Sequence, residues 1–329
     1  MHVSPIRTAA LVCGLAAATA FGALPAHAAT DPYSAFVFST SAATEPTIYN
    51  FIETATSSLN MTMYELVDTT VENDLVNLEK SGVTVRVILD QKEKSTNQAA
   101  YNTLSAGGVG VVWSSTSFTY THQKTITVNN DESLILSGNL TSEWYTTTRD
   151  YGVFDTDAAD VSAIVATFNA DYKHTSITPG AGDDLLWSPT TAQTRLLSII
   201  NGATKTLDIE EEEFSDSALI NAVVARAKAG VAVRVVVEDP SGYSSEITEI
   251  KNAGGKVVGY PESAALYIHA KAIVADYGLS DAAVEVGSMN WTSNSLGSNR
   301  ELGIILADTA AEKVVETQFA ADYAGGTAQ

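Results

Sequence analysis

The sequence predicts an α/β fold made of two tandem repeats, with mixed or mostly parallel central sheets flanked by helices. Two observations predict it. A strand–helix–strand pattern that begins near Leu59 returns 148 residues later near Leu207, and the polar residues that follow each pattern recur in the same order. Two copies of one unit pack naturally about a pseudo-twofold axis, and a site on that axis takes matching residues from each copy.

The first repeat opens with a β-prone stretch around Leu59, whose residues alternate in polarity. A helix is expected over about 71–80, and Gly82 ends it before a nearly continuous apolar strand over 83–90. Glycine is common just after the last turn of a helix. Strands without alternation are typical of a parallel sheet that is buried on both faces. The pattern therefore predicts a β-α-β unit.

The second repeat has the same order of elements. A strand begins at Thr206, a helix is expected over about 216–228, and an apolar strand over 231–238. A further short strand follows in each repeat, near 110–113 and near 256–259. The two units therefore predict the same sheet twice.

The first 28 residues are predicted to be a signal peptide. A basic start with Arg7 precedes an apolar, alanine-rich run over 9–24, and 25–28 reads Pro-Ala-His-Ala, a small-x-small cleavage site. Cleavage after Ala28 predicts a secreted protein, either extracellular or periplasmic. The first repeat is then expected over 29–178, a linker rich in proline and glycine over 179–191, and the second repeat over 192–329.

Composition excludes several classes of function. Cys13 is the only cysteine and leaves with the signal peptide, so the mature chain has neither disulfides nor thiolate chemistry. The net charge is −21, and loss of Arg7 makes it −22, since residues 1–28 hold no Asp or Glu. Nucleic-acid affinity comes largely from Lys and Arg on phosphates, so nucleic acid is an unfavoured partner. No metal-ligand cluster or P-loop is recognised, and neither a metal nor a cofactor is expected.

Two histidines stand in matching contexts. The chain reads Thr-His-Gln-Lys at 121–124 and Ile-His-Ala-Lys at 268–271, each at the start of a strand-like run. Residues two apart on a strand point to one face, so each histidine and its lysine are expected to face the same site. The candidates are His122, Lys124, His269 and Lys271.

Further polar residues recur after each histidine at matching intervals. Ser137 and Asn139 in the first repeat correspond to Ser288 and Asn290 in the second, and a carboxylate follows each asparagine by eleven positions. These carboxylates are Asp150 and Glu301, each preceded by an arginine. Polar residues at buried strand positions are costly unless they are used, so the repetition favours a shared active site.

Each residue type suits phosphodiester chemistry. A neutral imidazole attacks phosphorus and an imidazolium protonates a leaving alkoxide. Lysine and asparagine donate to phosphoryl oxygens that gain charge in the transition state. Ser137 and Ser288 are expected to bind substrate or to hold neighbouring groups. Asp150 and Glu301 are each placed to accept the far-side N–H of a histidine and so to fix its tautomer.

The two stretches resemble the duplicated HKD motif of the phospholipase D superfamily, His-x-Lys-x4-Asp followed by Gly-Ser-x-Asn. The second copy matches as His269, Lys271 and Asp276, then Gly287, Ser288 and Asn290. The first matches as His122, Lys124, Ser137 and Asn139, but Asn129 replaces the aspartate and Leu136 the glycine. The resemblance covers nearly all of the mature chain.

This resemblance implies metal-independent exchange of a phosphodiester through a covalent phosphohistidine. His122 would be the nucleophile and His269 the general acid, then the base for water or an alcohol. The motif aspartate supports local structure in this family, so Asn129 and Asp276 are expected to be structural. Asp150 resembles the carboxylate that orients the histidine.

Other residues have weaker interpretations. The acidic run 210–213 is expected at a solvated strand end, although Glu213 aligns with Glu65 and one carboxylate from each half could face the site. His174 has no partner in the other repeat and is expected on the surface. Trp144 and Trp291 follow the motif asparagines and either line the cleft or pack against it.

The leading hypothesis is a secreted, monomeric phosphodiesterase that hydrolyses or transfers phosphatidyl groups, with a phospholipid or other small phosphodiester as substrate and peripheral membrane contact. One alternative is a nuclease of the same superfamily, which the net charge disfavours. The other is a catalytically inactive phosphate-binding protein on this fold, which only the departures from the motif at Asn129 and Leu136 favour.

Overall fold

The computed structural model describes residues 32–38 and 45–329, and Pro32–Gln329 form one compact unit. The predicted signal peptide over 1–28 lies outside the described residues. Among the helices of the described part, none is long and apolar enough to cross a membrane.

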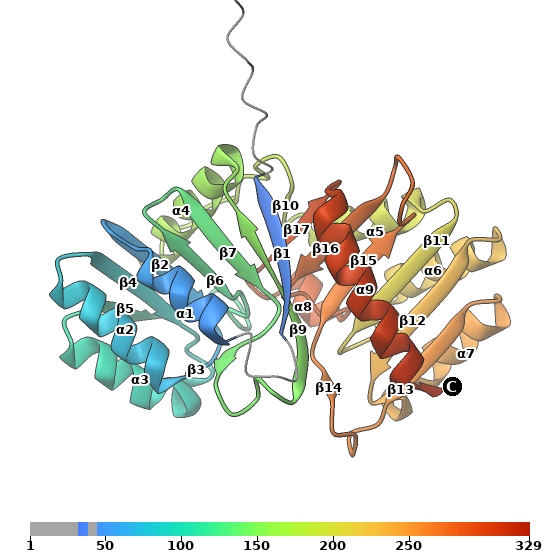
Figure 1. Cartoon of the computed structure of the whole chain (residues 1–329), viewed down its shortest axis with the longest axis horizontal. Helices are drawn as coiled ribbons and strands as arrows, with labels where there is room; N and C mark the ends of the chain where they lie inside the picture. Colours follow the sequence, from blue (N-terminus) through green and yellow to red (C-terminus); the bar gives the residue numbers. More distant parts are fainter. Residues whose placement is uncertain (1–31, 39–44) are drawn as a thin grey trace, which may run out of the picture. The chain divides into compact units, whose positions relative to one another are not determined.

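The first half forms a mixed sheet in which three parallel strands continue into antiparallel ones (Figure 1). The strands, in sheet order, are β1 (Tyr33–Phe38), β9 (Thr148–Asp155), β7 (Glu132–Leu136), β6 (Thr125–Val128), β2 (Ser58–Met63), β4 (Thr84–Leu89) and β5 (Gly110–Trp113). The expected β-α-β unit is β2, helix α2 (Thr69–Lys80) and β4, and β2 pairs in parallel with β4.

The second half repeats this order, with one short strand added at its end. Its sheet runs β10 (Leu185–Ser188), β17 (Glu301–Leu306), β16 (Ala283–Gly287), β15 (Lys271–Ala275), β11 (Thr206–Glu211), β12 (Ala232–Glu238), β13 (Lys256–Tyr260) and β18 (Thr327–Ala328). The parallel part is again β11, β12 and β13. The predicted two-repeat α/β fold is confirmed, and both sheets are mixed.

Helices cover the outer face of each sheet, as Figure 1 shows. The first sheet packs on α1 (Glu45–Glu53), α2 and α3 (Lys94–Ala106). The second packs on α5 (Ala192–Gly202), α6 (Ser217–Lys228), α7 (Ser244–Asn252) and the short α8 (Ser293–Gly297). Apolar residues at helical spacing, such as Leu219, Ile220 and Val223 of α6, are fully buried against the strands.

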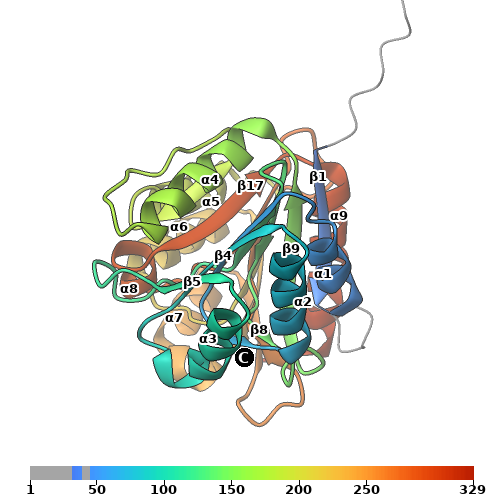
Figure 2. The same cartoon turned by 90° about the vertical axis from the view of Figure 1, so that its left-hand side faces the viewer.

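The inner faces of the two sheets share a third core. Ile135, Tyr151 and Val153 of the first sheet pack with Trp187 and Ile304 of the second. Helix α4 (Ala158–Tyr172) lies against β2 and β7, and α9 (Thr309–Gly325) lies against β1 as well as β11, β12, β15 and β16. Figure 2 shows α9 beside β1 at one side of the sheets, with α4 away from it. The C-terminal helix therefore holds the N-terminal strand.

Three short strands lie outside this repeated order. β3 (Leu66–Val67) pairs with β8 (Leu140–Thr141), and β14 (Tyr267–Ile268) of the second half pairs with β9 of the first. The segment expected as a linker, 179–191, contains β10, which pairs with β17 at the edge of the second sheet. The ranges of the two repeats stay a prediction.

The motif positions Asn129 and Asp276 lie in matching turns, and their structural role in the motif stays a prediction. Asn129 follows β6, which begins just after Lys124, and Asp276 follows β15, which begins at Lys271. Each of the two residues has a φ of 55°, and each closes the turn onto the first strand of its β-α-β unit. Asp276 accepts the backbone N–H groups of residues 204, 205 and 206 at 2.7, 2.6 and 2.9 Å. Asn129 accepts those of residues 56 and 57 at 2.8 and 2.9 Å. The asparagine therefore closes its turn by accepting from two backbone N–H groups, where the aspartate accepts from three.

The Leu136 departure is explained by the neighbouring strand. Leu136 lies opposite Gly152, where the absent side chain leaves room for it. Gly287 lies opposite Gly303, and a Cβ on Gly287 would come 2.7 Å from the Cα of Gly303. Each half therefore accommodates the close approach of its two strands with a different pair of residues, Leu136 with Gly152 in the first half and Gly287 with Gly303 in the second.

The two turns predict a difference in stability. Asp276→Ala leaves three backbone N–H groups without their acceptor and Asn129→Ala leaves two. At roughly 1 kcal/mol for each bond, we expect the free energy of unfolding to fall by about 3 and about 2 kcal/mol. Urea unfolding of both variants beside the parent measures it. Equal losses would contradict this account of the turns.

Candidate active site

The predicted site residues meet around a cavity of about 640 Å³ between the halves. Its described lining combines both histidines and both motif asparagines with carboxylates and aromatic rings. The lining includes His122, His269, Asn139, Asn290, Tyr64, Glu65, Trp144, Asp150, Glu212, Glu213, Glu262 and Tyr267.

The backbone of each histidine is held by the other half. His122 N–H donates to the carbonyl oxygen of Arg300 at 2.9 Å, and His269 N–H donates to that of Arg149 at 3.1 Å. Because the next residue after each arginine is a motif carboxylate, this crossed pairing brings each histidine to the carboxylate of the opposite repeat.

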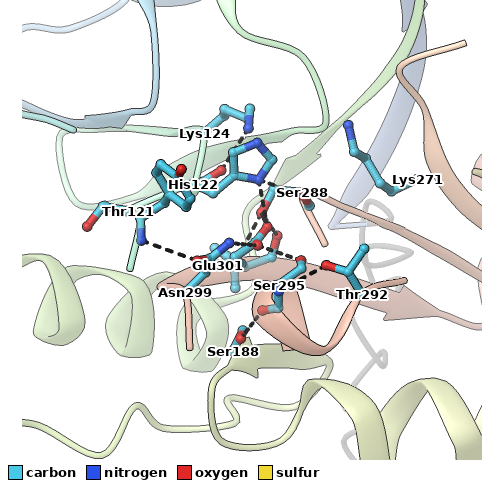
Figure 3. A network of polar contacts seen from close by, with 12 residues as sticks. Thr121, His122, Lys124, Ser188, Lys271, Ser288, Thr292, Ser295, Asn299 and Glu301 are labelled. Atoms are coloured by element: carbon cyan, nitrogen blue, oxygen red, sulfur yellow. Dashed lines mark hydrogen bonds and ion pairs between the residues drawn. The ribbon is translucent and has the colours of Figure 1, made fainter. Parts of the chain in front are cut away.

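His122 is bound by Glu301. Its Nδ1 lies 2.9 Å from Glu301 Oε2, which also accepts the hydroxyl of Ser288 at 3.0 Å. The other oxygen, Oε1, accepts from Ser295 at 2.6 Å and from Asn299 at 2.8 Å. Figure 3 shows this carboxylate at the centre of the network. A carboxylate so fully bonded fixes the ring and its Nδ1–H tautomer, and leaves Nε2 for chemistry.

His269 is bound in the same way by Asp150. Its Nδ1 lies 2.8 Å from Asp150 Oδ1, which also accepts the hydroxyl of Ser137 at 2.7 Å. Burial raises the pKa of Asp150, but His269, Lys271 and the serine outweigh it and lower that pKa below its ordinary value. The sequence predicted Asp150 and Glu301 as carboxylates that each orient a histidine, and the structure shows that each meets the histidine of the opposite half.

The serines hold the motif carboxylates. Ser137 and Ser288 are fully buried, lie outside the cavity lining, and donate to Asp150 and Glu301. This is the second of the two roles expected from the sequence, and a role in substrate binding stays a prediction.

The lysines bind their own histidine's backbone. Lys124 Nζ donates to the carbonyl oxygen of His122 at 2.8 Å and Lys271 Nζ to that of His269 at 2.5 Å. Both lysines are almost fully buried. Lys271 also pairs with Glu212 at 2.6 Å, whereas the Nζ of Lys124 lies 5.0 Å from the ring centroid of Tyr64. The two lysines thus have different neighbours.

Burial shapes the protonation of the first half. It lowers the pKa of His122 to about 4, helped by the charge of Lys124 and opposed by Glu301. Burial, then Lys271, lowers the pKa of Lys124 to about 7. His122 is therefore neutral, and able to act as a nucleophile, at every pH above about 4.

The asparagines lie at the cavity. Asn139 and Asn290 both line it, and Asn139 Nδ2 donates to Glu65 at 3.2 Å. The side-chain oxygen of each is buried with no hydrogen-bond partner. An amide oxygen only accepts hydrogen bonds, so the expected contact with an anion would have to come from the Nδ2 hydrogens.

The acidic run 210–213 is not a solvated strand end. Glu210 and Glu211 are buried, and Glu212 and Glu213 line the cavity. Glu210 accepts the hydroxyl of Tyr151 at 2.5 Å, across the contact between the sheets. The expectation failed because β11 lies in the middle of its sheet, with partners on both sides. The aligned carboxylates Glu65 and Glu213 do face the site.

Aromatic rings complete the cavity. Trp144 lines it and is 54% exposed, whereas Trp291 is fully buried against Phe214. Sequence reasoning missed Tyr64 and Tyr267, whose ring centroids lie 4.5 and 5.9 Å from those of His122 and His269. Tyr64 stands next to the aligned Glu65, which was the signal available. His174 is exposed, as expected.

Among residues 32–38 and 45–329, no three or more His, Cys, Asp or Glu side chains are arranged to hold a metal ion. The metal-free reaction implied by the motif stays a prediction.

The family model described as "Cardiolipin synthase, PLD-like domain" matches residues 48–172 and 196–323, which is most of the chain. The chain belongs to this family. The predicted membership of the phospholipase D superfamily is thereby confirmed, and the two matched segments fall in the two halves of the structure.

Known proteins support the same grouping. Mitochondrial cardiolipin hydrolases of Xenopus laevis and Xenopus tropicalis are each 31% identical over 130 residues. The match covers 39% of this chain and 59% of each hydrolase, so this chain spans under two thirds of those relatives.

Solved structures share the fold across both halves. Phosphatidylserine synthase from Haemophilus influenzae superposes with a TM-score of 0.69 at 13% identity, covering 91% of this chain and 87% of that one. Polyphosphate kinase from Porphyromonas gingivalis gives 0.68 at 14% identity, covering 88% and 50%. At such identities the likeness shows the fold alone.

Proposed function

We propose that this chain is a secreted phosphodiesterase of the phospholipase D type, which moves a phosphatidyl group to water or to an alcohol. One observation carries the proposal. Two histidines face one cavity, and each has its Nδ1 held by a buried carboxylate from the opposite half, at 2.9 and 2.8 Å. An inactive phosphate-binding protein has no need of two oriented imidazoles.

The reaction proceeds in two steps. His122 Nε2 attacks phosphorus and forms an N–P bond while the P–O bond to the leaving alcohol breaks, and His269 gives its Nε2 proton to that oxygen. His269 then removes a proton from water or an alcohol, which attacks phosphorus and releases His122. The asparagine amides are expected to donate to the phosphoryl oxygens, and the buried lysines, which lie outside the cavity lining, add positive charge beside the histidine backbones.

The cavity favours a lipid over a polyanion. Its described lining holds Glu65, Glu212, Glu213 and Glu262 but neither lysine nor arginine. Such a mouth repels a chain of phosphates. The exposed rings of Trp144 and Tyr267 suit a lipid–water interface, where one side of an aromatic is apolar and the other wet. The names of the similar hydrolases and of the synthase also refer to phospholipids.

Export is part of the proposal and rests on the signal-peptide pattern before Ala29. The N-terminal sequence of protein recovered outside the cytoplasm should begin at Ala29. A chain that still carries Met1 there would contradict it.

Loss of either histidine is expected to stop turnover at a different step of the reaction. We expect His122→Ala and His269→Ala each to lower kcat at least about 10³-fold on a phosphodiester, since removal of a nucleophile or an acid costs that much. Only His269→Ala should retain a single-turnover burst with a substrate whose alcohol leaves without protonation, such as p-nitrophenol. Circular dichroism controls for folding. Full turnover by either variant contradicts the mechanism.

The substrate class is tested by direct competition. Turnover of phosphatidylcholine vesicles and of single-stranded DNA is compared at 0.15 M salt, with Trp144→Ala beside the parent. We expect faster turnover of the vesicles, and a higher KM for vesicles but an unchanged KM for a short-chain soluble lipid in Trp144→Ala. Faster cleavage of DNA would overturn the lipid assignment.

A further inference from the structure

We infer that Glu212 and Tyr64 make the two histidines unequal, since Glu212 places a second carboxylate against His269, the acid, and Tyr64 places an uncharged ring against His122, the nucleophile. This inference rests on the proposed function. It concerns two residues that lie outside the recurring motif, and it makes a nearly symmetric pair of imidazoles unequal.

Tyr64 and Glu212 occupy the same place in the two halves. Tyr64 directly follows β2 and Glu212 directly follows β11, and these strands correspond in sheet order and in register with their neighbours. Each side chain reaches the histidine and lysine of its own repeat. The fold thus offers one position per half from which a side chain can set the charge of the site.

Glu212 places a second carboxylate on His269. Its Oε2 lies 3.6 Å from His269 Nε2 and 2.6 Å from Lys271 Nζ, and its other oxygen accepts the hydroxyl of Tyr267 at 2.5 Å. Asp150 holds the Nδ1 of the same ring at 2.8 Å. A neutral ring in this place would aim the Nε2 lone pair at a carboxylate, whereas an imidazolium aims a proton at it. The geometry therefore favours the charged ring.

Tyr64 provides no such charge to His122. Its ring packs edge-on against the imidazole, with centroids 4.5 Å apart, and lies 5.0 Å from Lys124 Nζ. Its hydroxyl donates to Glu93 at 3.2 Å, so that carboxylate binds the far end of the tyrosine. Within the described residues, the ion pair recorded for His122 is the one with Glu301. A buried ring with one carboxylate and a nearby lysine stays neutral.

The electrostatics agree with this division. Burial raises the pKa of Glu212, but His269 and Lys271 outweigh it and hold that pKa far below the ordinary value, so the carboxylate is ionised. Around His269 stand Asp150 from β9, Lys271 from β15 and Tyr267 from β14, besides Glu212. The charge of His269 also reaches two more carboxyls, Glu65 and Glu213. Among the described residues named here, carboxylates therefore outnumber the lysine that lies beside this ring.

The chemistry needs this inequality. In the first step the N–P bond forms at the neutral ring, and the proton on the charged ring goes to the leaving oxygen. If both rings were neutral, the alkoxide would leave without a proton. If both were charged, neither could attack. The additional carboxylate on the second half makes the two rings unequal in the direction that this step requires.

An exchange of the two residues tests the inference. The Tyr64→Glu/Glu212→Tyr double variant should reverse the roles, so that the phosphoryl group is trapped on His269 instead of His122. Phosphoenzyme is made in single turnover, quenched in alkali because phosphohistidine is labile in acid, and mapped by mass spectrometry of peptides. Phosphate on His122 in both the parent and the double variant would overturn the inference.

A second variant tests the inference if the double variant does not fold. Glu212→Gln keeps the shape but removes the charge, so the acid form of His269 should be lost at lower pH. We expect the alkaline limb of kcat/KM to move down by about 1 to 2 pH units, while the acid limb, set by His122 near pH 4, stays in place. An unmoved alkaline limb would overturn the inference.

Two controls separate this inference from the proposed function. Glu249→Gln removes an exposed carboxylate from α7 of the same half and should leave the pH profile unchanged. A parent enzyme that yields phosphate on neither histidine would refute the phosphohistidine mechanism itself. Phosphate on His122 in the parent, with Glu212→Gln indistinguishable from it in pH profile, would refute only the role of Glu212.

Discussion

The crossed contact between each histidine and the carboxylate of the other half is the interaction on which the site depends. Glu301 holds the ring of His122, and Asp150 holds that of His269. The backbone N–H of each histidine donates to the carbonyl oxygen of Arg300 or Arg149, and these bonds keep the two halves at the distance that the side-chain contacts require. The rest of the site follows from it. Serines hold the carboxylates, and the cavity lies at the two histidine rings. Neither repeat by itself supplies both a histidine and the carboxylate that orients it.

The arginines beside these carboxylates make a second set of crossed bonds. Arg149 pairs with Asp322 of α9 at 2.6 Å, and Arg300 pairs with Asp171 of α4 at 2.9 Å. All four side chains are largely buried. Removing one member of such a pair costs several kcal/mol, because it leaves the other charge unpaired away from water. The dipeptides Arg149-Asp150 and Arg300-Glu301 therefore join docking of the halves to alignment of the histidines.

Much of this could be predicted from the sequence, because the information was repeated. Apolar strands and glycine stops fixed both β-α-β units, and the recurring polar residues identified the histidines, lysines and asparagines. What failed was information that depends on the partner half. Local pattern does not say which carboxylate meets which histidine, or that the serines face those carboxylates. Glu212 was hidden in an acidic run, because only the neighbours of β11 decide which side chains are buried.

The late position of β17 and α9 in the chain has a consequence for biosynthesis. Glu301 begins β17, and α9 supplies Asp322 and covers β1, so these parts are synthesised after the first repeat. Until they fold, His122 has no carboxylate partner and β1 lacks the cover of α9. A first repeat that folds ahead of them therefore carries a histidine that nothing orients, and the site is complete only once β17 has paired.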